Sequence, residues 1–121
     1  MLPHLAYADD VHAALVEAGV PPELVSISAN REIAERELIA IFSWDDVVLR
    51  WSSDAGWRHE APQSGGPLPL DRVSSPVAVV AVVQSLVGGQ PPIESNDRWG
   101  GAEYLELAIS RWKQPHAASV R

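Results

Sequence analysis

The chain has 121 residues, of which 46% are hydrophobic and 21% are charged, a composition typical of one globular domain and unlike that of a disordered chain. It contains no cysteine, which excludes disulfides, thiol catalysis and cysteine-ligated zinc. Its net charge of −7 disfavours a nucleic-acid partner, because the average field repels a polyanion.

The first predicted element is a helix over residues 3–19. Apolar residues there recur at the spacing of one helical face, at Leu5, Ala8, Val11, Leu15 and Ala18. Gly19 and the two prolines after Val20 end this helix, because proline cannot donate the next backbone hydrogen bond. From Leu24 to Ala29 apolar and small polar residues alternate, which predicts a strand at the edge of a sheet.

The stretch from Glu37 to Trp57 reads as a β-meander around which the rest of the chain is organised. The strands are expected at residues 36–43, 47–52 and 57–60, with tight turns at 44–46 and 53–56. The first of them is apolar at five successive positions, so we expect it inside the sheet with both faces at least partly covered. Trp57 is expected opposite Trp51 as an aromatic cross-strand pair.

The second half of the chain alternates loops and helices. Residues 61–71 are rich in proline and glycine and are predicted to form a loop. A helix is expected over residues 75–87, with Ser75 as its N-cap and Pro76 at its first position. Because it is apolar on nearly every side, we expect it to be buried on nearly every side. The last helix is predicted from Arg98 to Lys113 with Asp97 as its N-cap, followed by a frayed tail.

These elements predict a single α+β domain over residues 1–121. Its sheet is an antiparallel meander of three to four strands. The N-terminal helix and the two C-terminal helices pack mainly on one face of that sheet. Residues 113–121 are expected to form the frayed tail.

Part of the sequence is similar to small uncharacterised domains from Streptomyces and other actinomycetes. The similarity is carried by SWDDVVLRW, by Gly56 and Trp57, and by the apolar helix that ends in VVQSLVGG, and it spans roughly residues 5–89. It implies an α+β fold and an actinobacterial or phage source. No activity is assigned to that family, so the resemblance implies no catalytic residue.

Motifs that would name a reaction are absent from the sequence. No serine stands in a G-x-S-x-G elbow, and neither glycine pair has the context of a phosphate loop. Asp9 with His12, and Asp45 with Asp46, are conceivable metal or acid–base pairs, but surface hydrogen bonding and turn formation explain them more simply. We predict no catalytic, cofactor-binding or metal-binding residue, and no cofactor.

The five tryptophans are the best candidates for binding residues. Trp44 in a turn and Trp99 at a loop–helix junction have no predicted place in the core, so they are candidate anchors for a partner. Packing over the rim of the core is the alternative. A different hypothesis places a pocket between sheet and helices, lined by Trp51, Trp57 and His59.

Targeting and function follow from these patterns. The longest apolar run is shorter than the roughly 20 residues of a membrane helix, and the start of the chain does not resemble a signal peptide. We expect a cytoplasmic, non-enzymatic protein-interaction or accessory regulatory module whose partner is another protein or a second copy of the chain. The motivation is that the apolar helix and the central strand carry more hydrophobic surface than one small sheet can hide. The alternative is a small-molecule-binding or enzymatic domain built around the predicted pocket; a nucleic-acid accessory role is disfavoured by charge.

Overall fold

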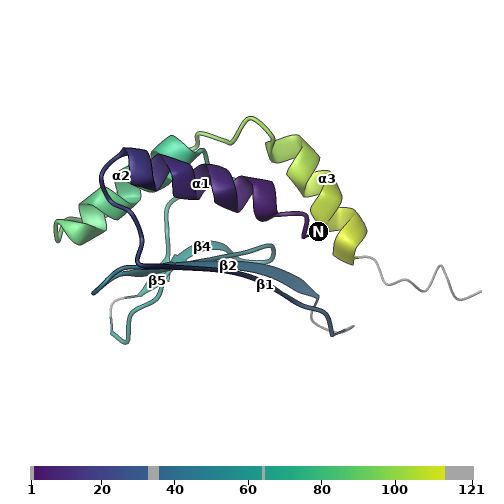
Figure 1. The fold of residues 1–121 in the computed structure, drawn as a ribbon, viewed down its shortest axis with the longest axis horizontal. Coiled ribbons are helices and arrows are strands. Elements are labelled where there is room, and N and C mark those ends of the chain that lie inside the picture. Colours follow the sequence, from purple (N-terminus) through teal and green to yellow (C-terminus); the bar gives the residue numbers. More distant parts are fainter. Residues whose placement is uncertain (1, 33–35, 64, 114–121) are drawn as a thin grey trace, which may run out of the picture.

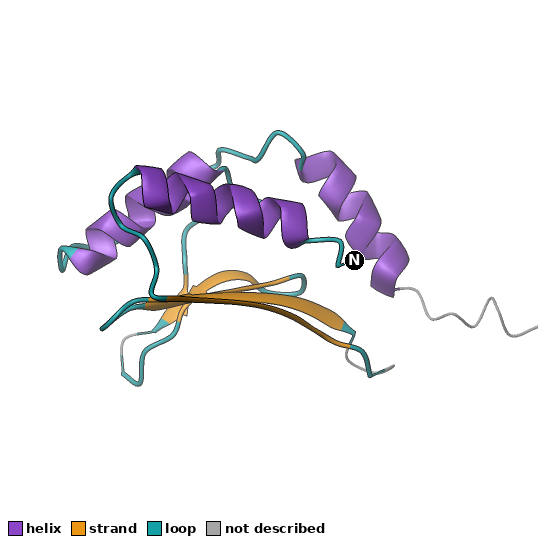
Figure 2. Cartoon of the chain, viewed as in Figure 1, coloured by secondary structure: helices purple, strands orange, loops and turns teal. Residues whose placement is uncertain are grey.

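A computed structural model describes residues 2–32, 36–63 and 65–113 and shows a two-layer α+β fold, which confirms the predicted class. Three helices cover one face of an antiparallel sheet, and no helix covers its other face in the part of the chain described (Figures 1 and 2). The elements in chain order are α1 (Leu5–Glu17), β1 (Leu24–Asn30), β2 (Glu37–Ser43), β3 (Val48–Ser52), β4 (Gly56–His59), β5 (Gly66–Pro67), α2 (Pro76–Val87) and α3 (Ala102–Lys113).

The strands follow one another across the sheet in the order β1-β2-β3-β4-β5. The predicted pair of Trp51 and Trp57 is confirmed, because the two residues lie opposite each other in β3 and β4. The sheet has one strand more than the upper limit expected. Gly66 and Pro67, predicted as loop, form β5 and pair with β4. Two residues are too few to show an alternating pattern, so this strand could not be predicted from periodicity.

The core lies between the helices and the face of the sheet beneath them. In β2 every second residue is buried, and the other residues are only half-buried on the open face. The predicted interior position of β2 is therefore confirmed, although helices lie over only one of its faces. The largest side chains that are fully buried are Trp51, Tyr7, Phe42, Leu15, Leu38, Leu49 and Leu105.

Helix α2 begins as its sequence predicts. The Ser75 side chain accepts a hydrogen bond from the Ala78 N–H at 3.2 Å, and Pro76 occupies the first turn, where its missing N–H costs nothing. The expected burial on nearly every side is wrong. Val77 is 75% exposed and Val87 is 54% exposed, because the helix lies at the rim of the layer and only one of its faces meets the core.

Helix α3 begins later than predicted, at Ala102, and Asp97 does not cap it. The segment before it runs alongside the chain that precedes α2 instead. The Trp99 N–H donates to the Val73 carbonyl at 2.9 Å, and the Ser75 N–H donates to the Asp97 carbonyl at 3.1 Å. These long-range hydrogen bonds hold the segment against the chain before α2, so residues 98–101 do not form the first turn of the helix. The predicted tail lies, apart from Lys113, outside the described residues.

One buried histidine couples the fold to pH. The His4 side chain is fully buried, its ring stacks on Trp51 with centroids 5.6 Å apart, and its Nε2 lies 2.9 Å from the Ile39 carbonyl oxygen. A carbonyl only accepts, so Nε2 carries the proton, and Nδ1 has no hydrogen-bond partner in the structure. Burial lowers the pKa of His4 from its ordinary 6.5, against the opposing effect of nearby backbone carbonyls.

We therefore expect stability to fall as the pH drops below about 6.5. In the unfolded chain His4 binds a proton near that pH, whereas in the folded chain it binds one only at a lower pH, so acid favours unfolding. The check is urea unfolding at pH 7.5 and 5.5 for the wild type and His4→Phe, which keeps a ring but cannot titrate. The variant should lose less stability between the two pH values. Equal losses would show that His4 does not carry the effect.

Candidate functional site

The predicted inner pocket is filled by its own tryptophans. Trp51 is 1% exposed and Trp57 is 2% exposed. The Nε1–H of Trp51 donates to the Arg72 carbonyl at 2.7 Å, and that of Trp57 donates to the Tyr7 hydroxyl at 3.1 Å. Both indoles occupy the space between sheet and helices, so a ligand there would have to displace them. His59 lies two residues after Trp57 in β4 and lines a hollow at the rim of the fold.

The two candidate anchors, Trp44 and Trp99, are half-buried and packed against the core. The Nε1–H of Trp44 donates to the Val20 carbonyl at 3.0 Å. The Nε1–H of Trp99 donates to the Asp10 carboxylate at 2.9 Å, and its ring lies 4.9 Å from that of Tyr7. The polar edge of each indole is thus occupied within the chain. Their role as partner anchors stays a prediction.

An acidic hollow of about 320 Å³ lies at the rim beside the β2–β3 turn. It brings together residues that are distant in sequence, which periodicity alone did not predict. Its lining consists of Glu23, Trp44, Asp45, Asp46, Val47, His59, Leu86 and Val87. Among the described residues, no group of three or more His, Asp or Glu side chains that could hold a metal ion is found.

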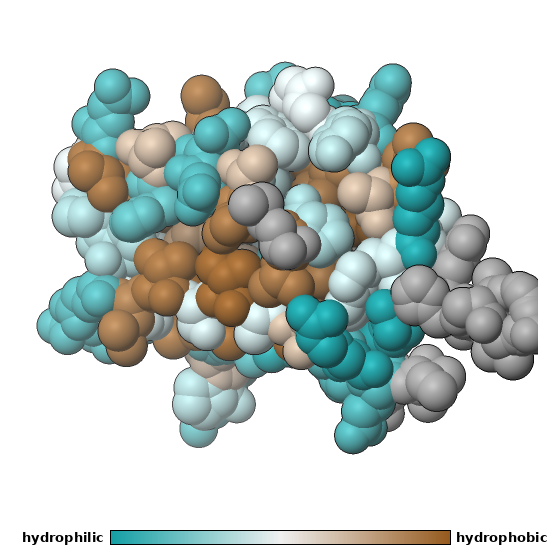
Figure 3. All heavy atoms as spheres, turned by 45° about the vertical axis from the view of Figure 1, so that its right-hand side comes forward, coloured by the Kyte–Doolittle hydropathy of each residue, from teal (hydrophilic) through white to brown (hydrophobic). Residues whose placement is uncertain are grey.

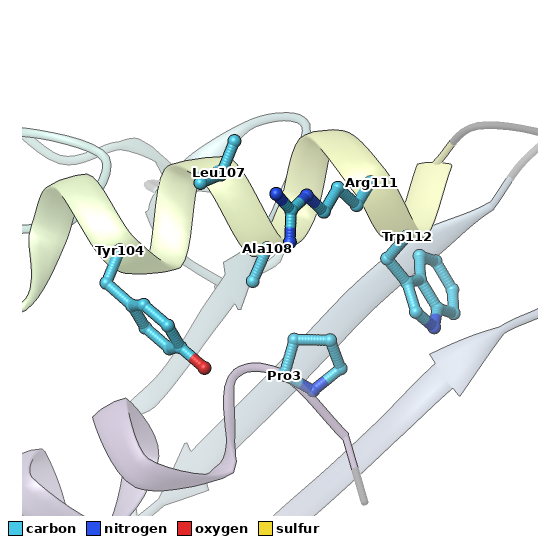
Figure 4. Close-up of a pocket in the computed structure, with 6 residues that line it drawn as sticks. All are labelled: Pro3, Tyr104, Leu107, Ala108, Arg111 and Trp112. Atoms are coloured by element: carbon cyan, nitrogen blue, oxygen red, sulfur yellow. The ribbon is translucent and has the colours of Figure 1, made fainter.

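A shallow apolar groove of about 310 Å³ runs along α3 (Figure 4). Tyr104 and Trp112 stand toward its two ends, and Pro3 of the N-terminal segment lies between them. Tyr104 is 76% exposed, and Leu107 above the groove is 52% exposed. The ring of Trp112 packs beneath the Arg36 guanidinium at 4.5 Å. The groove is an exposed apolar surface with one cationic border, and sequence reasoning did not predict it.

The open face of the sheet is mixed in character. Ile39, Ile41 and Val48 are half-buried there. Charged side chains stand among these apolar residues and pair with each other, Arg50 with Glu37 at 3.9 Å and Arg58 with Glu60 at 3.6 Å. This face is less apolar than a core and less polar than a wholly solvated surface.

The outer edge of β1 is the most distinctive surface in the described part of the chain. The strand is seven residues long, LVSISAN, and it carries no charge and no proline. No other described strand pairs with its outer side, and Leu24 is 71% exposed and Val25 36% exposed. Hydrophobic side chains gather in a band on the side of the molecule that Figure 3 presents. The opposite edge, β5, has only two residues, and one of them is Pro67.

Hydrogen bonding at the next strand shows which backbone groups of β1 face outward. The bonds from the Trp44 N–H to the Val47 carbonyl and from the Ser53 N–H to the Leu38 carbonyl mark even-numbered residues of β2 as those bonded toward β3. The odd-numbered residues of β2 therefore bond toward β1, where they face even-numbered partners. By this alternation, the N–H and C=O groups directed at the open edge are those of Val25, Ile27 and Ala29.

The comparisons with known proteins give this chain no relative. No family model matches it, and neither a curated protein nor a solved structure is significantly similar to it. The resemblance to actinobacterial domains therefore stays a prediction. In the part of the chain that the structure describes, no helix is long and apolar enough to cross a membrane.

Proposed function

We propose that this protein is a non-enzymatic protein-interaction module that takes up an additional strand from its partner along the outer edge of β1. The observation that carries the proposal is the exposed, uncharged, seven-residue edge strand. Strand addition draws its affinity from main-chain hydrogen bonds and its selectivity from alternate side chains. The outward groups of Val25, Ile27 and Ala29 supply the first of these, and the half-buried side chains of Ile27 and Ala29 supply the second.

The contrast between the two edges of the sheet supports the proposal. Proteins commonly blunt an edge with a short strand, a proline or a lysine, because an open edge invites pairing with other chains. The β5 edge has the first two of these features, whereas β1 has none of the three. A sheet that blunts one edge and leaves the other open is the arrangement expected when the open edge pairs with a strand of another chain in the working protein. The net charge of −7 favours a protein over a nucleic acid as the partner.

The experiment is peptide selection followed by an edge-blocking variant. Peptides that bind the wild-type chain are selected from a random display library. Binding is then measured for Val25→Pro, which lacks an outward N–H and keeps the β1–β2 ladder, and for Val25→Thr, which has a similar shape and keeps the N–H. We expect Val25→Pro to weaken binding at least tenfold, because the ring also obstructs the neighbouring strand. Val25→Thr should bind within about threefold of the wild type.

Circular dichroism of both variants should match the wild type, which separates a blocked edge from an unfolded chain. Peptides that bind Val25→Pro as well as the wild type would place the binding surface elsewhere and overturn the proposal. A library that yields no binding peptide for a chain that is monomeric at the screening concentration would count against strand addition as well.

A further inference from the structure

We infer that the strand added at this edge is β1 of a second copy of the chain, running antiparallel, with a twofold axis passing beside Ile27. The inference rests on the proposed function and names its partner. The two sheets would then join into one, with five strands from each copy. A twofold contact of this kind uses the same surface on both copies and closes on itself, so it consumes the open edge completely.

The register follows from the length and symmetry of the strand. Ile27 is the central residue of β1, Leu24–Asn30. When Ile27 lies opposite its own counterpart, all seven residues of the strand are paired. The outward backbone groups also meet correctly, because Val25 then faces Ala29 of the second copy and Ile27 faces Ile27, each as a hydrogen-bonded pair.

Charge complementarity at the strand ends selects the same register. The nearest charged residues on either side of β1 are Glu23 and Arg31, and both are exposed. With Ile27 at the centre, Glu23 of each copy comes close to Arg31 of the other just beyond the paired strands, which allows two ion pairs to form. Sliding the strands by two residues in either direction separates both pairs and leaves part of each strand unpaired. The strand itself is uncharged, so no like charges face each other along its seven residues.

The helix layer agrees with this arrangement. Because the twofold axis stands perpendicular to the joined sheet, the helices of both copies lie on the same side of it, with α1 facing α1. Ala14 and Ala18 line a groove with α2 and so mark the inner side of α1. Leu5, His12 and Val16 lie on the opposite side of the helix at spacings of seven and four residues. Val16 is 51% exposed in the single copy, and the neighbouring helix would cover it.

The first test is the mass in solution across a range of concentrations, by light scattering or sedimentation. The wild type should form a dimer with a measurable dissociation constant. Glu23→Arg and Arg31→Glu should each raise that constant about tenfold or more, because each turns two attractive contacts into two repulsive ones. The double variant Glu23→Arg/Arg31→Glu restores opposite charges and should return to within about threefold of the wild type.

The second test determines the register by cross-linking, and the lack of native cysteine removes any background. Ser26 and Ser28 are exposed on the open face, away from the core. In the inferred register Ser26 lies opposite Ser28 of the other copy as a close, non-hydrogen-bonded pair, within reach of a disulfide. Mixing Ser26→Cys with Ser28→Cys chains under mild oxidation should therefore give more cross-linked dimer than either variant alone.

Each outcome distinguishes this inference from the proposed function. A wild type that stays monomeric at all concentrations, yet binds peptides in a way that Val25→Pro abolishes, overturns the second-copy inference and leaves a foreign strand as partner. A dimer that the charge reversals do not weaken overturns the inferred contact. Cross-linking of Ser26→Cys with itself shifts the register by two residues and overturns the placement of the twofold axis. A chain that stays monomeric and binds no peptide at this edge contradicts the proposed function.

Discussion

Replacing Trp51 with alanine is expected to lower the free energy of unfolding by about 3–5 kcal/mol. The side chain is 1% exposed, so truncation leaves a large cavity at the centre of the sheet. It also removes the donor to the Arg72 carbonyl and the surface on which the His4 ring stacks. A buried acceptor left without a partner adds its desolvation cost to that of the cavity.

Urea denaturation of three variants measures this effect. Trp51→Phe keeps a ring and loses only the hydrogen bond and part of the volume, so it should cost less than alanine and fold even where alanine does not. Tyr104→Ala removes an aromatic side chain that is 76% exposed and should change stability by no more than about 0.5 kcal/mol. If Trp51→Ala proved as mild as Tyr104→Ala, the tryptophan would not be the centre of the core.

Features that depend on neighbouring residues were predicted correctly from the sequence. The Ser75 cap with Pro76 and the turn ending at Gly56 follow from local hydrogen bonding and backbone freedom, and the structure has both, with Gly56 at a φ of 75°. The Trp51–Trp57 pair follows from the length of that turn, which fixes the register of the hairpin. The run of five apolar residues in β2 likewise predicted a strand inside the sheet, and β2 lies between β1 and β3.

Features that depend on distant partners were not predictable in this way. Asp97 looks like a helix cap, but its carbonyl accepts from the Ser75 N–H, more than 20 residues away in sequence, and the helix starts later. The exposure of Val77 depends on where α2 lies over the sheet, and hydropathy does not encode that position. Gly66 and Pro67 form β5 because they pair with the edge of β4, and that pairing cannot be recognised from two residues alone.

The same distinction applies to the candidate site. The alternation from Leu24 to Ala29 predicted an edge strand, and the structure has one there. The sequence did not show that the other edge is short and closed by Pro67, and this contrast is what singles out β1. Trp44 and Trp99 are candidate anchors because they are large side chains without a predicted place in the core. Their indole N–H groups bond to Val20 and Asp10, contacts that span many residues and leave no periodic signature.

Replacing Tyr7 with phenylalanine is expected to cost about 2–4 kcal/mol, although it removes a single oxygen atom. Tyr7 is 2% exposed, and its hydroxyl donates to the Ser74 carbonyl at 2.5 Å and accepts from the Trp57 Nε1–H at 3.1 Å. Burial raises the pKa of this hydroxyl, so it remains a neutral donor throughout the physiological range. Removing it leaves one buried carbonyl and one buried N–H without their partner.

The chain supplies its own control in Tyr104, the other of its two tyrosines. Tyr104→Phe removes the same atom from a side chain that is 76% exposed and should leave stability within about 0.5 kcal/mol of the wild type. Urea denaturation compares the two, with near-ultraviolet circular dichroism to report the packing of Trp57. The Tyr7 hydroxyl joins α1, β4 and the segment before α2, so a large cost would mean that this polar junction helps to hold the helices over the sheet. Equal stability of the two variants would mean that apolar packing alone holds them there.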